Sequence, residues 1–250
     1  EGFFFSHPVS VKLQSVLNAG DIEAVQISAN GQLAPINLKP WLGDLTQSMS
    51  GLSRYQTLLT VPMSDAPIHI IFDSNTVGWK IDLPEPFKKS ADKPLAIHYE
   101  MELQSPTKQT GYLMVGAALQ SGFEVENSLI KRMMIQLGEN WTGTLPPEGL
   151  WVRGQLSEMN VDEWLPWLRP IHNNKAPQHV ASVMPALQSF NVGFDNMSYL
   201  GYQLHNVRLG YEPLDDASRF QITSSDLNGE LIWPFDAHKK VKLNLQSLKF

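Results

Sequence analysis

Apolar and polar residues alternate in many short stretches of this chain, and a repeat of two residues is typical of a β-strand with one face in water. In the clearest stretch, apolar residues at every second position alternate with residues that include His98, Glu100 and Glu102. The apolar positions of this stretch are Leu95, Ile97, Tyr99, Met101 and Leu103. The pattern predicts a strand over 95–103 with one apolar face.

Further alternating runs lie between clusters of Gly, Pro, Asn and Asp. One of them, Leu113–Leu119, follows a turn-rich segment, and it predicts a hairpin with 95–103. Between Leu204 and Val207 the alternation slips by one residue, which indicates a β-bulge. Such closely spaced strands favour an antiparallel sheet over βαβ units. The other runs are Val25–Ile27, Ile68–Phe72, Met133–Leu137, Phe190–Phe194, Tyr202–Tyr211, Leu231–Trp233 and Val241–Leu245.

Two stretches break the alternation and predict short helices. Asn160–Leu168 has Asn160 at an N-cap position and acids in its first turn, while Pro166 is expected to limit its length. Pro177–Leu187 has apolar residues at helical spacing. A helical insertion is therefore expected at about 160–187, and a further short helix is expected near Trp41–Leu45.

Length and composition place the chain among globular proteins. It has 250 residues, a hydrophobic fraction of 42% and a net charge of −6, without a basic stripe that would neutralise nucleic acid. No run of about 18 apolar residues predicts a membrane span. The chain opens on Glu1-Gly2-Phe3-Phe4-Phe5 and stops directly after an alternating run, so we expect residues 1–250 to be one β-fragment of a longer protein.

No residue constellation in the sequence points to catalysis. The chain has no cysteine, and its seven histidines are scattered, so neither a thiolate site nor a histidine metal site is predicted. It contains no G-x-S-x-G, G-x-x-x-x-G-K-[ST] or G-x-G-x-x-G motif. We therefore expect no enzymatic activity, no catalytic residues, no metal and no cofactor. The alternative is a hydrolase whose catalytic residues are far apart in the sequence. It would require a close Ser/His/Asp or paired-carboxylate arrangement in a cleft of the folded chain.

The predicted strands supply much apolar surface but few helices to cover it. Such a sheet can pack on a second sheet, close into a barrel, or keep an apolar surface for a hydrophobic ligand. Periodicity alone does not separate these outcomes, and a filled sandwich or barrel is the more common one.

Three segments contain ordered Gly, Leu and Pro motifs. The first, 72–95, contains the pattern G-x-x-x-x-L-P-x-P-x-x-K followed by P-L, carried by Gly78, Leu83, Pro84, Pro86, Lys89 (or Lys88 beside it), Pro94 and Leu95. The second, 149–164, has a strand, a G-x-L step and a D-x-W helix start. The third, 190–250, has a strand, a turn, and x-x-L-x-G-x-L before Pro234 and a further strand. In this order the three segments resemble the YhdP branch of the AsmA-like envelope proteins.

The resemblance implies a fold and a function. Proteins of this kind are anchored at the inner membrane of Gram-negative bacteria and extend through the periplasm. Their antiparallel strands curl into an elongated, taco-like groove with an apolar inside and one or two short helices. They are implicated in conducting phospholipids toward the outer membrane, without a cofactor or a chemical step. This chain would be a periplasmic piece of that groove, continuous with a longer chain that carries the anchor, and with envelope partners that stay unidentified.

On this hypothesis the apolar faces of several strands line the groove, and the Asn160–Leu168 helix caps it with Trp164 and Trp167. The alternative is a structural or interaction β-module whose apolar faces are filled core. The expected lining residues are Leu95, Ile97, Tyr99, Met101, Leu103, Leu113, Val115, Phe190, Val192 and Phe194.

Overall fold

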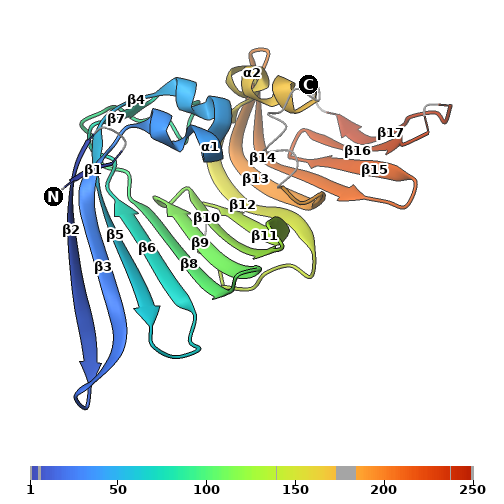
Figure 1. Cartoon of the computed structure of the whole chain (residues 1–250). Helices are drawn as coiled ribbons and strands as arrows, with labels where there is room; N and C mark the ends of the chain where they lie inside the picture. The colour runs from blue at the N-terminus through green and yellow to red at the C-terminus, as the bar shows by residue number, and fades with distance from the viewer. Residues whose placement is uncertain (1, 5–6, 139, 173–183, 237, 249–250) are drawn as a thin grey trace. The chain divides into compact units, whose positions relative to one another are not determined.

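The computed structural model describes residues 2–4, 7–138, 140–172, 184–236 and 238–248 (Figure 1). Within these residues, fifteen strands belong to one main sheet, and β4 and β7 form a separate two-stranded sheet. The predicted mainly β class is therefore confirmed. The chain divides into two compact units, one of residues 1–83, 87–117 and 121–129, the other of residues 84–86, 118–120 and 130–250.

The first unit is a meander in which neighbouring strands are also close in sequence. Its order in the main sheet is β1-β2-β3-β5-β6-β8-β9-β10, and the pairs from β1 to β9 are all antiparallel. The bounds are β1 (Gly2–Phe4), β2 (His7–Asn18), β3 (Asp21–Leu33), β4 (Met49–Gly51), β5 (Ser53–Pro62), β6 (Ile68–Ser74), β7 (Trp79–Ile81), β8 (Ile97–Ser105), β9 (Lys108–Val115) and β10 (Leu119–Glu126).

Strand register places the apolar residues of this unit on one face. Tyr99 in β8 lies opposite Phe72 in β6 and Leu113 in β9, and residues directly opposite each other in a ladder share a face. The next positions, His98 and Glu100, therefore point to the other face. The predicted alternation between an apolar and a polar face is confirmed here.

Three short helical segments and the small β4–β7 sheet lie at one end of these strands (Figure 1). Trp79 in β7 is 1% exposed, and its indole N–H donates to the carbonyl of Leu33 at 2.8 Å. It forms a buried cluster with Leu33 and Tyr55, against which Phe72 and Ile97 pack. This end of the apolar face is thus covered by the chain itself. The three segments are η1 (Pro35–Leu38), α1 (Lys39–Leu42), which begins two residues before the helix expected near Trp41–Leu45, and η2 (Gly43–Ser48).

The three helical segments and the β4–β7 sheet form a cap over this end of the apolar face, and a buried lysine stabilises it. Lys89 is 6% exposed, and its ammonium donates to the carbonyls of Thr76 at 3.0 Å, Trp79 at 2.6 Å and Ser90 at 3.1 Å. Its own main chain pairs with that of Ile81 in both directions at 2.9 Å. Because burial favours the neutral amine, the pKa of Lys89 is lowered. Of the two lysines that fit the motif, Lys89 is the one built into the structure, whereas Lys88 is exposed.

Gly78 of the same motif is needed for backbone approach. Its φ is 100°, and a Cβ atom there would lie 2.1 Å from the carbonyl oxygen of Leu52. Gly51 meets Gly78 in the same way, since a Cβ at Gly51 would lie 1.9 Å from the Gly78 carbonyl oxygen. Only glycine fits either position without moving the two chains apart.

The second unit continues in strand order β11-β12-β13-β14-β15-β16-β17. From β13 to β17 every neighbouring pair is antiparallel, as predicted. The bounds are β11 (Leu129–Leu137), β12 (Gly149–Asn160), α2 (Val161–His172), β13 (Leu187–Tyr199), β14 (Tyr202–Pro213), β15 (Ala217–Thr223), β16 (Leu227–Pro234) and β17 (Lys242–Leu248).

The expectation of antiparallel strands fails at β12. This strand runs parallel to both β11 and β13. The alternation of side chains is the same in both kinds of sheet, so the sequence pattern does not report strand direction. The connections 138–148 and 161–186 carry the chain back to the same end of the sheet, and connections of that length permit parallel pairing.

The predicted helix after Asn160 is present and longer than expected. The Asn160 side-chain oxygen accepts from the N–H groups of Asp162 at 3.1 Å and Glu163 at 3.4 Å, which confirms the N-cap. The helix runs through Pro166 to His172, since a proline removes one main-chain hydrogen bond without ending a helix whose other bonds are kept. The second predicted helix, Pro177–Leu187, lies mostly outside the described residues, and Leu187 itself begins β13.

A second buried cluster lies where α2 meets β13 and β14. Val192, Phe194, Met197 and Val207 form it, and Val161 at the start of α2 packs against it. The pairs Phe194–Val207 and Asn196–His205 keep one register, while Asn206 between them has a φ of 52°. The slip in the alternation therefore occurs in β13 and β14 together, rather than as the predicted bulge of one strand.

Two strand ends differ from the expected ones. Leu95 precedes β8, because its N–H donates to the carbonyl of Asn75 and its carbonyl accepts from the Thr76 hydroxyl, both at 2.8 Å. The run Leu113–Leu119 is divided at Gly116, whose φ is 54°, so that Leu119 begins β10. In both places the local hydrogen bonds take the chain out of the ladder that the alternation predicted.

The buried ammonium generates a stability prediction. Lys89→Met keeps much of the apolar stem but leaves three carbonyls without their donor, and each unpaired buried group costs about 1–3 kcal/mol. We expect Lys89→Met to lower the free energy of unfolding by about 2–4 kcal/mol in urea titrations. The matched variant Lys88→Met should change it by less than about 0.5 kcal/mol. Equal effects at both positions would show that the three hydrogen bonds do not stabilise the cap.

Candidate functional site

An apolar groove lies on the second unit, over the last five strands of the sheet. It has a volume of about 790 Å³. Side chains of Leu, Ile, Phe and Tyr dominate its lining, and the few polar residues come from strand positions between them. The lining residues are Leu187, Phe190, Leu209, Gly210, Tyr211, Ser218, Phe220, Gln221, Ile222, Leu227, Gly229, Glu230, Leu231, Leu243 and Leu245.

Strand register explains how residues far apart in the sequence form this lining. Phe190 lies opposite Tyr211, which lies opposite Phe220, and the row continues through Leu231 to Leu243. A second row runs from Leu209 through Ile222 and Gly229 to Leu245. Because Gly229 has no side chain, the floor is lowered at this point. The groove is therefore a direct product of the two-residue alternation in five strands.

The groove remains accessible. Phe220 is 42% exposed, Leu243 is 65% exposed and Leu245 is 52% exposed. Large apolar side chains rarely stay this exposed in a contiguous group on a monomeric protein, and such groups mark binding surfaces. The groove is therefore an exposed apolar surface and not a part of the buried core.

Of the three predicted lining residues in this unit, one lies in the groove and two lie in the buried core. Phe190 lines the groove. Val192 and Phe194 share its face but are buried, at 0% and 3% exposure, in the cluster beneath α2. Trp164 of α2 donates its indole N–H to the carbonyl of Glu85 at 3.1 Å, and neither Trp164 nor Trp167 lines the groove.

The remaining predicted residues lie in the first unit, on the apolar face of β8 and β9 or just before β8. Ile97 packs on the cluster around Trp79, and Leu95 lies within the connection that leads to β8. Tyr99 stacks on Phe123 of β10 with ring centroids 6.3 Å apart, and its hydroxyl lies 3.1 Å from the Met101 sulfur. All seven are half-buried, and at the β2 edge of the same face Val11 and Leu13 are 52% and 67% exposed. The seven residues are Leu95, Ile97, Tyr99, Met101, Leu103, Leu113 and Val115.

Most of the groove lies outside the predicted lining. Its other residues belong to alternating runs of the sequence, and this alternation is the signal that could identify them. They include Leu209, Tyr211, Leu231, Leu243 and Leu245. The alternation does not report that Val192, Phe194 and Val207 are buried together against the start of α2, while Phe190 and the facing residues of β14–β17 stay open.

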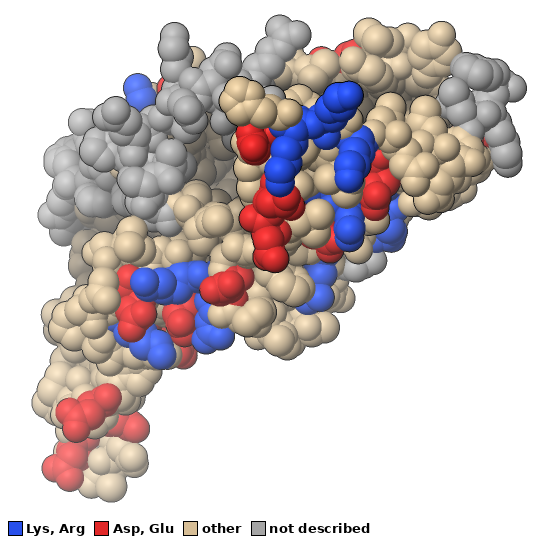
Figure 2. Space-filling view, turned by 90° about the vertical axis from the view of Figure 1, so that its right-hand side faces the viewer, with Lys and Arg blue, Asp and Glu red and all other residues tan. Residues whose placement is uncertain are grey.

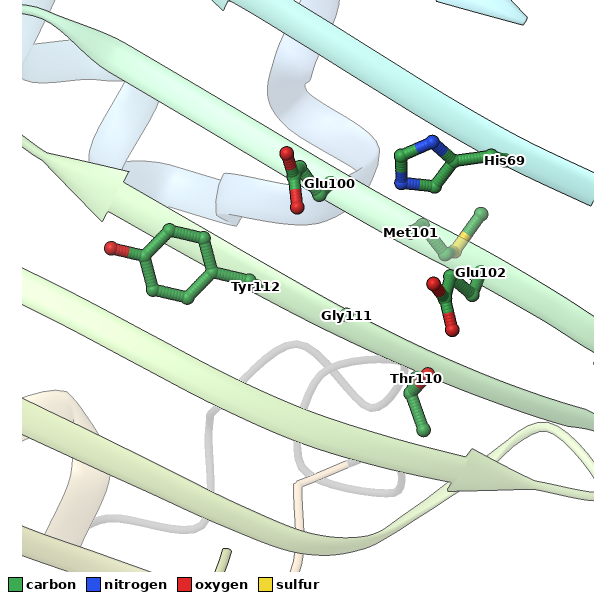
Figure 3. A pocket seen from close by; sticks show the side chains of 7 residues that line it. All are labelled: His69, Glu100, Met101, Glu102, Thr110, Gly111 and Tyr112. Carbon is green, nitrogen blue, oxygen red and sulfur yellow. The ribbon is translucent and has the colours of Figure 1, made fainter. Parts of the chain in front are cut away.

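The opposite, polar face of the first unit carries a shallow depression of about 170 Å³ on β6, β8 and β9. It is lined by His69, Glu100, Met101, Glu102, Thr110, Gly111 and Tyr112 (Figure 3). Among the described residues, no group of three or more His, Cys, Asp or Glu side chains is close enough to hold a metal ion. This depression is lined mainly by polar and charged side chains of the sheet.

His98, beside this depression, bridges two carboxylates. Its Nδ1 lies 2.7 Å from Asp73 and its Nε2 lies 3.0 Å from Glu100. A neutral imidazole has a single N–H, so both contacts are hydrogen bonds only in the protonated ring. The hydrogen bond with Asp73, followed by that with Glu100, raises the pKa of His98 against the opposing effect of burial.

Charged side chains of both signs mix on the surface that Figure 2 shows. Lys and Arg gather beside Asp and Glu there, and uncharged residues separate the clusters. That face has no extended stretch of positive charge of the kind that binds nucleic acid. None of the helices in the described residues is long and apolar enough to cross a membrane.

The structure defines a class: a mainly β protein with an open apolar groove on its second unit and half-buried apolar strand faces on its first. The model of the YhdP protein family matches residues 2–250. The chain therefore belongs to the YhdP family, within the AsmA-like group of lipid-transport-type envelope proteins. The resemblance seen in the sequence is thus confirmed. That group is a transport family and is not known for enzymatic activity. No curated protein and no solved structure matches the chain.

The His98 bridge predicts a pH dependence of stability. A pKa raised in the folded state gives a stabilisation that is complete below the unfolded pKa of about 6.5 and is lost as the pH rises through the folded value. His98→Gln should therefore lower the free energy of unfolding more at about pH 5.5 than at about pH 9. We expect a difference on the order of 1 kcal/mol or less, because the ring is partly exposed.

The comparison uses urea titrations of the native chain and of two variants at both pH values. His205→Gln is the control, since Nδ1 of His205 contacts the uncharged Asn196 side chain at 2.8 Å. If the two variants show the same dependence on pH, the bridge to Asp73 and Glu100 has no role in it.

Proposed function

We propose that this chain binds the acyl chains of phospholipids along the apolar faces of its strands. In this proposal it is a periplasmic segment of a conduit between the inner and outer membranes. The observation that carries the proposal is the open apolar groove over β13–β17, with Phe220, Leu243 and Leu245 exposed in one continuous lining. Membership in a lipid-transport-type family supports the same ligand class.

The chemistry of the groove suits an acyl chain. Each CH₂ group that leaves water for an apolar surface gains about 0.8 kcal/mol, so a chain lying along Leu, Ile and Phe side chains is held without specific hydrogen bonds. Aliphatic and aromatic linings also accept chains of different length and saturation. A conduit needs this combination of favourable burial and low specificity, because the ligand has to move on.

The half-buried apolar face of the first unit extends the proposal to β2–β9. Met101, Tyr99 and Leu113 would contact lipid where the cap around Trp79 ends. We propose that the strands of each unit form the wall of an elongated, taco-like groove, with the polar positions toward water. The anchor in the inner membrane would belong to the longer chain of which this is a part.

Lipid extraction tests the ligand class. The chain is purified from the periplasm of a Gram-negative host, extracted with organic solvent and examined by mass spectrometry. We expect about one or more phospholipids per chain, in contrast to a periplasmic protein of similar size that is purified in parallel. A chain without extractable lipid would favour the alternative of a structural β-module.

Paired substitutions on opposite faces of one strand locate the lipid. Leu243→Glu places a charge in the groove lining, whereas Asn244→Glu places the same charge on the other face of β17. Both residues are exposed, so neither change should unfold the chain. We expect Leu243→Glu to reduce the bound lipid at least fivefold, and Asn244→Glu to leave it within twofold of the native amount, since burying a charge costs about 1 kcal/mol or more.

The same design applies to the first unit. Met101→Glu alters the apolar face and Met114→Glu the polar face, because Met114 lies opposite His98. If the face of Met101 contacts lipid, Met101→Glu should lower the bound lipid while urea titrations show a folded protein. Global unfolding by Met101→Glu alone would identify this face as filled core.

A further inference from the structure

The turn between β13 and β14 exposes three large apolar side chains. Tyr199 and Tyr202 lie opposite each other at the ends of the two strands, and Leu200 and Gly201 form the turn between them. Tyr199 is 44% exposed, Leu200 is 67% exposed and Tyr202 is 74% exposed. No Asp, Glu, Lys or Arg occurs from 196 to 206. These residues, the β13–β14 hairpin end, therefore combine exposed apolar surface with the absence of a charged side chain.

Leu200 adopts a backbone conformation that is unfavourable for leucine. Its φ is 50° and that of Gly201 is 83°, and a two-residue turn with positive φ at both positions is of type I′. Asn-Gly is the preferred sequence of this turn, whereas a bulky residue at positive φ is strained. The strain is not offset by burial, since the leucine side chain is mostly in water. A strained and exposed apolar residue of this kind points to a binding role.

The hairpin end is held in place by α2 and by the core behind it. The N–H of Leu200 donates to the Asp162 carboxylate at 2.8 Å, so the turn lies beside the start of α2 (Figure 1). Met197 and Leu204, the next apolar pair along the hairpin, belong to the buried cluster or pack against it. Because the turn is already fixed in the folded chain, little conformational entropy is lost when Leu200 makes a contact.

The size of the exposed surface distinguishes between two kinds of partner. An aromatic side chain buries about 150–250 Å² when it is fully covered. Two partly exposed tyrosines and one leucine therefore offer about 500 Å² at most, which is less than the roughly 800 Å² per partner of a stable protein interface. A bilayer requires no complementary surface, and tyrosine is enriched at its boundary with water. The hairpin end thus fits a lipid surface better than a protein partner.

We propose that the β13–β14 hairpin end inserts into the surface of a lipid bilayer. Leu200 enters the acyl-chain region, and Tyr199 and Tyr202 lie at the level of the headgroups, where each ring contacts apolar chains and each hydroxyl contacts water. Since residues 196–206 carry no charged side chain, no ion has to lose its hydration when they insert. This contact is separate from the binding of acyl chains in the groove and does not depend on it.

The acidic start of α2 sets the depth and the lipid preference of this contact. The Asp162 carboxylate lies at the turn, and Glu163 follows it in the chain. A carboxylate is costly to remove from water, so insertion stops where Asp162 reaches the headgroups. The same negative charges are repelled by an anionic lipid surface. The hairpin end is therefore suited to a bilayer of zwitterionic lipid.

Sedimentation with sucrose-loaded vesicles tests the insertion. The vesicles consist of phosphatidylcholine alone or of phosphatidylcholine mixed with anionic phosphatidylglycerol, at a large excess of lipid. Leu200→Asn removes the inserted side chain and creates the preferred Asn-Gly turn. Tyr202→Ser provides a second variant outside the turn itself. Leu17→Asn is the matched control, since Leu17 is 63% exposed on β2, next to a hairpin turn that the acidic residues Asp21 and Glu23 follow.

The native chain should sediment with the phosphatidylcholine vesicles, and to a smaller extent with the mixed vesicles. Leu200→Asn should lower the partition coefficient about 5- to 10-fold, because full burial of a leucine contributes more than about tenfold and the insertion is shallow. Its urea midpoint should stay the same or rise, since the turn loses its strain. Tyr202→Ser should also weaken binding, whereas Leu17→Asn should bind like the native chain.

The groove and the hairpin end can be tested apart. Leu200→Asn should keep the lipid that is extracted from the purified chain, and Leu243→Glu should keep the binding to vesicles. If the native chain sediments with neither kind of vesicle, the membrane proposal is wrong and the exposed side chains mark a protein contact instead. Equal losses in Leu200→Asn and Leu17→Asn would show unspecific adsorption. Tighter binding to the anionic vesicles would place the contact at basic residues elsewhere in the chain.

Discussion

The main sheet depends on one constraint: each strand turns every second side chain to the same apolar face, and that face has to be shielded from water. Because neighbouring strands are paired residue by residue, the constraint acts on all strands of the sheet together. Since Tyr99 faces both Phe72 and Leu113, and Phe220 faces both Tyr211 and Leu231, a shift of one residue in any strand would move its apolar set to the polar side. Register and apolar face are therefore the same property of this sheet.

Each unit shields only a part of this face with its own chain. In the first unit the shield is the cap around Trp79, and it is held by an ammonium that three carbonyls surround. In the second unit the start of α2 covers Val192 and Phe194. The first cover lies at one end of its strands, whereas Val192 and Phe194 lie midway along β13. Outside its cover, each unit keeps half-buried or exposed Leu, Ile and Phe side chains. A ligand bound there would shield these side chains from water.

Much of this fold could be predicted from the sequence, because a two-residue alternation is a local signal that survives in the folded chain. Strand positions, the helix after Asn160 and its cap followed from residues that are close in sequence. The direction of β12 could not be predicted in this way, since side chains alternate identically in parallel and antiparallel strands. The groove was only partly predicted, with Phe190 placed in it, while Val192 and Phe194 are buried on the same face. Which apolar positions stay open depends on where α2 packs, and that contact joins distant segments.

The order of the strands also has a consequence for how the chain folds. Almost every strand pairs with the one that precedes it, so most of the sheet can grow by adding one hairpin at a time, with short loops to close. The parallel strand β12 is different, because β13 joins it only after the 26 residues from 161 to 186 have been threaded back to the starting end. Pairing across this connection is the least local step of the sheet, and it is expected to be slow relative to the hairpins. Until it occurs, β12 presents an unpaired edge, so folding of this family member is most exposed to misassociation at the point where the meander changes direction.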